Sequence, residues 1–182
     1  MRYLTRNIKM SSNSDKYVIF DVETTGFNPQ HGARIIEIGV VHIENGNIIS
    51  EFKSLINCGK AVSKQAQKVN GITNEMLSGE PTPEEVFPDF LKFISKSTLV
   101  AHNAVFDISF LRYELSRLGF VLSNDYLCTL NISRKIFPDL ENHKLLTVAK
   151  HILVNLPKNL HLHRALDDAR LTAMIWMEMM QR

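Results

Sequence analysis

The order of strand-like and helical segments is the feature that most constrains the fold of this chain. Apolar and β-branched residues fill residues 17–23 and 34–43, and residues 47–56 form a third such segment after an Asn-Gly dipeptide typical of hairpin turns. Helical patterns follow and are interrupted by a short apolar strand at 98–101. Three consecutive strands with tight turns indicate antiparallel pairing, and the later alternation of strand and helix predicts an α/β fold with a mixed sheet.

Capping residues and apolar stripes predict the helices that cover this sheet. Ser63 and Thr73 are candidate N-caps of two short helices, and Thr82 begins a capping box. The helix after Thr82 contains Pro88, a residue that disfavours a helix interior. The remaining predicted helices run over residues 104–118, 129–136, 143–153 and from about 164 to the C-terminus.

Composition places the chain among ordinary globular proteins. It has 182 residues, 45% of them hydrophobic and 22% charged, which suits a single domain over residues 17–182 after a flexible polar leader at 1–16. No apolar stretch is long enough to cross a bilayer, and the leader does not resemble a secretory signal. Cys58 and Cys128 provide no disulfide framework, so we expect a cytoplasmic protein.

The net charge of +2 excludes a protein that holds duplex DNA by bulk electrostatics. It does not exclude an enzyme that acts on nucleic acid, because a site that binds one end of a nucleic-acid strand through metal ions needs few lysines.

Two acids, Asp21 and Glu23, interrupt the first strand near its end. At spacing i, i+2 they point to the same side of a strand, and carboxylates are rarely buried without a partner. A strand end exposed to solvent would explain them equally well when they are taken alone. Thr24, Thr25 and Gly26 follow directly, however, and this combination favours a site for a hard cation and a phosphate.

A third acid, Asp107, lies in the first turns of the helix after the strand at 98–101. A favourable interaction with the helix dipole would account for it without any function. His102 and Asn103 form the turn between strand and helix, and such strand ends are where sites collect in α/β sheets.

The last candidates, His163 and Asp168, are five residues apart. Within one regular helix their side chains would diverge by roughly 140°, so they converge only if His163 lies before the helix or at its first residue. Asp167 is the competitor and is expected to face solvent or to cap the helix. A capped surface helix with an exposed histidine is the simpler interpretation of this segment alone.

One arrangement explains all these residues together. Acids from two strand-adjacent segments and one late helix would surround two divalent metal ions, with a histidine beside them. Such a metal pair serves phosphodiester hydrolysis. Carboxylate oxygens suit magnesium, and the lack of a cysteine or histidine cluster argues against zinc.

Three segments at suitable spacing carry a family resemblance: FDVETTG (20–26), AHNAVFDISFL (101–111) and HRALDDARLTA (163–173). Together they resemble the DEDDh family of 3′–5′ exonucleases, closest to the proofreading epsilon subunits of bacterial DNA polymerase III. The resemblance covers about residues 17–178. It implies a ribonuclease H-like fold, which is a five-stranded mixed β-sheet flanked by α-helices.

The resemblance also implies roles for individual residues. Asp21, Glu23 and Asp168 would be metal ligands for two Mg²⁺ or Mn²⁺ ions, Asp107 would complete the acidic quartet, and His163 would be the general base. The substrate-binding candidates are Thr24, Thr25, Gly26, Phe27, Gln65, Asn70, His102, Asn103 and Phe106. Asn70 stands where the proofreading subunit usually has histidine, and Gln65 stands where it usually has an acid.

The implied activity is removal of nucleoside 5′-monophosphates from single-stranded or frayed DNA 3′ ends, in proofreading or repair and with a possible polymerase catalytic subunit as partner. An RNA-trimming enzyme of the same family is the alternative, and a non-catalytic nucleic-acid-binding module on this fold is a further one. The sequence ends at Arg182, before the clamp- and polymerase-binding tail of a full-length proofreading subunit. We therefore expect either a stand-alone exonuclease or a catalytic fragment.

Overall fold

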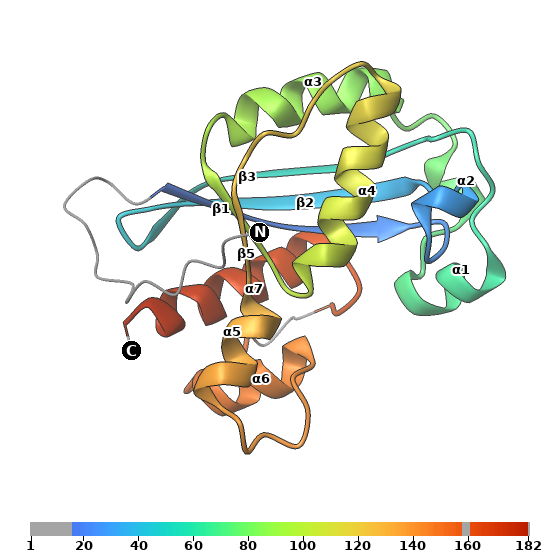
Figure 1. The fold of residues 1–182 in the computed structure, drawn as a ribbon. Helices are drawn as coiled ribbons and strands as arrows, with labels where there is room; N and C mark the ends of the chain where they lie inside the picture. The colour runs from blue at the N-terminus through green and yellow to red at the C-terminus, as the bar shows by residue number, and fades with distance from the viewer. Residues whose placement is uncertain (1–15, 158–160, 182) are drawn as a thin grey trace.

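The computed structural model describes residues 16–157 and 161–181, and its centre is one five-stranded sheet in the order β3-β2-β1-β4-β5 (Figure 1). The strands are β1 (Lys16–Thr24), β2 (Ile35–Glu44), β3 (Asn47–Leu55), β4 (Thr98–Ala101) and β5 (Tyr126–Cys128). β1, β2 and β3 pair antiparallel, whereas β4 and β5 continue the sheet in parallel with β1. The predicted mixed sheet of five strands is confirmed.

The first three strands follow the sequence closely. Asn45 and Gly46 adopt φ angles of 52° and 75°, as the hairpin between β2 and β3 requires. β1 begins one residue before the predicted domain boundary, because Lys16 pairs with Glu44 across the sheet at 3.1 Å. The rest of the predicted leader, residues 1–15, lies outside the described residues. β5 was not predicted as a segment, since three residues are too few to show a strand periodicity.

The helices begin where the capping residues indicated. Ser63 and Thr73 accept hydrogen bonds from Ala66 N and Met76 N at the starts of their helices. Thr82 forms the capping box of its helix, which includes Pro88 in its interior. The helices are α1 (Lys64–Asn70), α2 (Asn74–Leu77), α3 (Pro83–Ile94), α4 (Ala104–Arg117), α5 (Thr129–Ile136), α6 (Leu145–Ile152) and α7 (Ala165–Met180), with a 3₁₀ turn, η1, at Pro29–His31.

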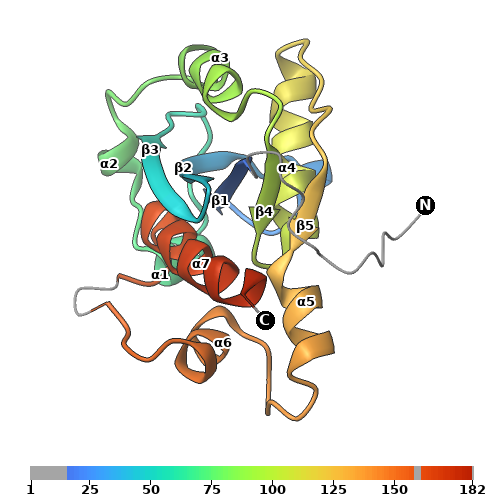
Figure 2. The same cartoon turned by 90° about the vertical axis from the view of Figure 1, so that its left-hand side faces the viewer.

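Helices cover both faces of the sheet (Figures 1 and 2). α3 and α4 pack on one face, where Phe20 and Val40 meet Phe87 and Leu111. α7 packs on the other face through residues such as Trp176, and α6 packs against α7. Among the helices of residues 16–157 and 161–181, none combines the length and apolarity that crossing a membrane requires.

The length difference between β1 and β4 creates room for a site. β4 pairs only with Tyr17–Ile19, so the second half of β1 extends past the end of β4. Alternation along β1 places Asp21 and Glu23 on the same face as Ile19, which is the face covered by α7. The carboxyl ends of β1 and β4 therefore open toward the starts of α4 and α7, the kind of strand end where α/β sheets bind ligands.

Candidate active site

The acids and the histidine predicted to act together line one pocket at the carboxyl end of β1. They are Asp21, Glu23, Asp107, His163 and Asp168. Three distant segments supply them: β1, the first turn of α4, and the start of α7. The structure thus brings the predicted quartet and the histidine to one place, although their catalytic roles remain predictions.

Asp107 reaches the pocket from the opposite side of β1. Its side chain is buried, with 3% of the residue exposed, and its Oδ1 accepts a hydrogen bond from Val22 N at 3.3 Å. This backbone donor is free because β4 has already ended at that point of β1. The short β4 therefore explains why an acid on α4 can join acids that face α7.

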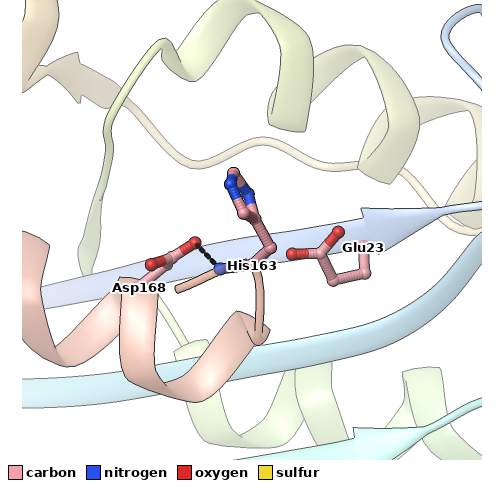
Figure 3. Close-up of side chains that lie close together, drawn as sticks. All are labelled: Glu23, His163 and Asp168. Carbon is pink, nitrogen blue, oxygen red and sulfur yellow. Dashed lines mark hydrogen bonds between the residues drawn. The ribbon is translucent and has the colours of Figure 1, made fainter. Parts of the chain in front are cut away.

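His163 lies just before α7, as the spacing argument required. Its backbone N–H donates to Asp168 Oδ2 at 3.0 Å, and its φ angle of 62° is in the left-handed region (Figure 3). This tight turn brings residues five apart onto one site. Ligand atoms of Glu23, His163 and Asp168 all lie within 4.8 Å of one another.

Asp167 takes part in a different set of contacts. Its carboxylate accepts a hydrogen bond from Arg170 Nη1 at 3.2 Å and lies 3.5 Å from His161 Nδ1. It is not among the residues that line the pocket. Of the two acids, Asp168 is therefore the one that lines the pocket, and its role as a metal ligand stays a prediction.

Crowding of carboxylates gives the site an unusual electrostatic character. Burial, then repulsion from Asp107 and Asp168, raises the pKa of Asp21 well above its ordinary value. Burial together with the charge of Asp168 raises the pKa of Glu23 to about 8. Burial likewise raises the pKa of Asp107 to about 7 and that of Asp168 to about 6. Burial and mutual repulsion therefore make these carboxyls bind protons at a higher pH than isolated carboxyls do.

The metal-free protein is expected to lose stability as the pH rises. In the unfolded chain these carboxyls titrate at about pH 4, so the folded state binds more protons between about pH 4 and pH 8. The contribution of these carboxyls to the free energy of unfolding is fully present below their unfolded pKa values. It is lost as the pH rises through their folded pKa values of about 6, 7 and 8.

Asp21→Asn should relieve this repulsion. In EDTA at pH 8 we expect its melting temperature to exceed that of the wild type by at least ~2–4 °C, the equivalent of about 1 kcal/mol in a domain of this size. At pH 4 the difference should shrink. A melting temperature that is independent of pH in both proteins would contradict the electrostatic description.

The chemistry of the donor set fits divalent metal ions. The pocket gathers carboxylate oxygens, which are the ligands that Mg²⁺ and Mn²⁺ prefer. Asp168 Oδ1 is buried and has no hydrogen-bond partner among the residues that the structure describes. Buried acceptors without a partner are rare, and a bound cation would satisfy this one.

His102 contributes its ring to the pocket wall, but both ring nitrogens bond within the protein. Nε2 lies 2.9 Å from the backbone oxygen of His143, and Nδ1 lies 2.9 Å from Thr129 Oγ1. Because a carbonyl only accepts, Nε2 carries a proton. Thr129 Oγ1, the partner of Nδ1, also lies 3.4 Å from Ala101 O, and burial lowers the pKa of the His102 ring. His102 is therefore a fixed wall of the pocket with no free ring nitrogen.

Most other predicted substrate-binding residues also line the pocket. These are Thr24, Gly26, Phe27, Asn70, Asn103 and Phe106. Phe27 is 69% exposed at the rim, whereas Asn70 is buried and donates to Thr24 O at 3.4 Å.

Two of the predicted substrate-binding residues, Thr25 and Gln65, are not among the lining residues. Thr25 Oγ1 accepts from Arg34 N at 3.0 Å, and Gln65 is exposed on α1. The sequence analysis missed Val22, Ala66 and Val69 as lining residues. In the sequence these three are ordinary apolar residues, and only their positions next to Asp21, Gln65 and Asn70 connect them with the site.

Comparisons with known proteins agree on one family. A family model described as an exonuclease of the RNase T type matches residues 18–176. The DNA polymerase III subunit epsilon of Aquifex aeolicus is 35% identical over 184 residues, covering 100% of this chain and 89% of that protein. The PolC-type DNA polymerase III of Clostridium perfringens is 40% identical over 164 residues. The chain spans only 11% of the length of that polymerase.

Solved structures support the fold. Exonuclease X in complex with 5′ overhanging duplex DNA is 28% identical, with a TM-score of 0.74 and 91% of both chains covered. The nuclease domain of 3′hExo, a DEDDh family member bound to rAMP, is 18% identical with a TM-score of 0.78, covering 93% of this chain and 94% of that one. At 18% identity, the similarity to 3′hExo supports the fold alone. The predicted ribonuclease H-like fold is confirmed.

Proposed function

Since the chain belongs to the RNase T exonuclease family, we propose that it is a metal-dependent 3′–5′ exonuclease that releases nucleoside 5′-monophosphates from DNA 3′ ends. The observation that carries the proposal is the convergence of four carboxylates and His163 on one pocket from three segments of the chain. A non-catalytic binding module on this fold would have no need of this costly grouping of acids.

Asp21, Glu23 and Asp168 would hold two Mg²⁺ or Mn²⁺ ions, with Asp107 completing the set. When bound, such ions lower the pKa of a water molecule and stabilise charge on the leaving oxygen of a phosphodiester. His163 is the proposed general base, because its ring stands next to the acids while its backbone N–H is held by Asp168 Oδ2 at 3.0 Å. The exposed ring of Phe27 and that of Phe106 offer faces on which terminal bases can stack.

DNA is the proposed substrate, and proofreading or repair the proposed role. Two relatives support this proposal. An epsilon subunit of DNA polymerase III matches over nearly its whole length, and Exonuclease X was solved with duplex DNA that has a 5′ overhang. The epsilon subunit also motivates a polymerase catalytic subunit as the proposed partner.

The test of the proposed function is an assay on end-labelled single strands. DNA and RNA of one sequence, labelled at the 5′ end, are incubated with Mg²⁺ or Mn²⁺ and resolved as ladders. A ladder that shortens by single nucleotides from the 3′ end of DNA supports the proposal. A ladder on RNA alone would make the enzyme an exoribonuclease, and no product from either substrate would exclude the exonuclease function.

Unpaired 3′ ends are expected to be cut faster than paired ones. The pocket must take terminal nucleotides out of the stack, which costs a few kcal/mol when they are paired and less when they are mismatched. The net charge of +2 leaves little electrostatic attraction to offset that cost. We expect at least ~10-fold faster release from a duplex with a mismatched 3′ end than from a matched blunt duplex. Equal rates on the two duplexes would contradict this.

A further inference from the structure

A fifth carboxylate, that of Glu37, lies beside the site and has no part in the chemistry described above. Glu37 is on β2 directly across from Glu23 in the pairing of β1 with β2, and only 5% of the residue is exposed. Its Oε1 accepts from Arg164 Nη2 at 2.7 Å, and both of its oxygens lie within 3.2 Å of Arg164 Nε. The two side chains therefore form a bidentate ion pair between the sheet and the residue that follows His163.

The same carboxylate also binds the start of α7. Glu37 Oε2 accepts from the backbone N–H of Ala165, the first residue of α7, at 3.1 Å. Helix N-terminal N–H groups have no partner within the helix, so a carboxylate there acts as a cap. Arg164, the N-cap residue itself, makes no side-chain cap. Glu37 thus supplies this cap from another strand.

Gly39 lies two residues after Glu37 on the same face of β2, and it allows the first residues of α7 to pack closely against this strand. A Cβ on Gly39 would lie 2.1 Å from Leu166 N and 2.3 Å from Ala165 C, so any side chain there would displace the backbone of α7. The start of α7 therefore packs directly against the backbone of β2 at Gly39. It is also hydrogen-bonded to Glu37, two residues earlier on the same strand. His163 is the residue immediately before this anchored stretch, in a strained left-handed conformation.

We propose that Glu37 and Arg164 are positioning residues, which hold the turn at His163 so that its imidazole faces Glu23 and Asp168. This inference rests on the proposed function, since His163 is the general base there. Neither residue is needed to touch the substrate. Their effect passes through the backbone of residues 163–165, and a misplacement of a catalytic group by 1 Å can cost about 100-fold in rate.

The chain contains a matched control for this ion pair. Arg170, on the same helix, binds Glu51 on the neighbouring strand β3 with the same bidentate geometry, at 2.6 and 2.9 Å. It attaches α7 to the sheet and also binds Asp167, whose carboxylate contacts His161. The backbone N–H groups of His163 and Ala165 are bonded instead to Asp168 and Glu37. A purely structural role of Arg164 should therefore be matched by Arg170, whereas a positioning role should not.

The kinetic test compares Arg164→Gln and Arg170→Gln on a single-stranded DNA. For Arg164→Gln we expect kcat to fall ~10–100-fold with KM within about threefold of wild type, and Arg170→Gln should stay within about twofold. Arg164→Lys keeps the positive charge but cannot form the bidentate pair, so its kcat should lie between those of the wild type and Arg164→Gln. Equal losses in Arg164→Gln and Arg170→Gln would overturn the proposal.

A second background identifies the residue through which Arg164 acts. In His163→Ala, adding Arg164→Gln should lower the remaining activity by less than about twofold, because no base is left to position. The same loss in both backgrounds would mean that Arg164 acts on the substrate or the metal ions directly, and the proposal would be wrong.

Amide hydrogen exchange gives a readout that does not depend on activity. Arg164→Gln and Glu37→Gln should speed exchange at His163 and Ala165 by at least about tenfold, whereas Arg170→Gln should leave those amides protected. Unchanged protection in Arg164→Gln and Glu37→Gln would overturn the proposal. If the wild type cleaves neither DNA nor RNA, the proposed function fails, and the exchange result still decides whether the pair positions the turn.

Discussion

Asp168→Asn is expected to lose more than about 100-fold in exonuclease activity, above the cost of substitutions that only support a metal ligand, whereas Asp167→Asn should stay within about threefold of wild type. The two variants remove one negative charge each, from adjacent residues of one helix. Their difference therefore reports which side of α7 meets the site. It does not report a general effect of charge on the helix or on the fold.

The physical reason lies in the contacts of the two carboxylates. Asp168 is 93% buried, and its Oδ1 has no partner within the described part of the chain, so the residue has an oxygen available to a cation. Asparagine can still accept the N–H of His163, which keeps the turn while weakening the metal site. Asp167 is already engaged by Arg170 at 3.2 Å and points away from the pocket.

Two measurements check this prediction together. Manganese titration by calorimetry should show weakened binding in Asp168→Asn and near-normal binding in Asp167→Asn, and the activity on single-stranded DNA should follow the same order. Thermal melting in EDTA is the control for folding. Neither variant should melt more than ~2–4 °C below the wild type at pH 8, the equivalent of about 1 kcal/mol for one exposed ion pair. Equal loss of activity in the two variants would contradict the assignment of Asp168.

Much of this site was predictable because its signals are local in sequence. Asp21 and Glu23 share a face by strand alternation alone, and the five-residue spacing of His163 and Asp168 required a turn before α7. The structure shows that turn, with His163 at a φ angle of 62°. The preference for Asp168 over Asp167 followed from the same geometry.

What escaped prediction depends on contacts between segments far apart in the chain. Glu37 looked like one more residue of a buried strand, and nothing local indicates that it meets Arg164, 127 residues later. Thr25 and His102 were taken as candidates to contact substrate, but Thr25 accepts the backbone of Arg34, and both ring nitrogens of His102 are bonded within the fold. Sequence predicted which residues gather, and only the structure shows which atoms are still free to react.

Replacing His163 with alanine is expected to lower kcat by roughly 10²–10⁴-fold, the usual contribution of a general base. The wild-type rate should rise with pH along an acid limb, because a general base acts only without its proton. This limb should be shallower in His163→Ala, where the carboxylates still bind protons. Metal binding should survive, because the four carboxylates remain in the pocket.

The position of His163 makes a second role testable in the same experiment. Its ring nitrogen lies within 4.8 Å of ligand atoms of Glu23 and Asp168, which is close enough for the imidazole to bind a metal ion itself. Manganese affinity measured alongside the pH–rate profile separates the two roles. A base leaves affinity intact while kcat falls, whereas a ligand loses affinity. Near-normal turnover with an unchanged acid limb would exclude both roles, and the base would have to be sought elsewhere in the pocket.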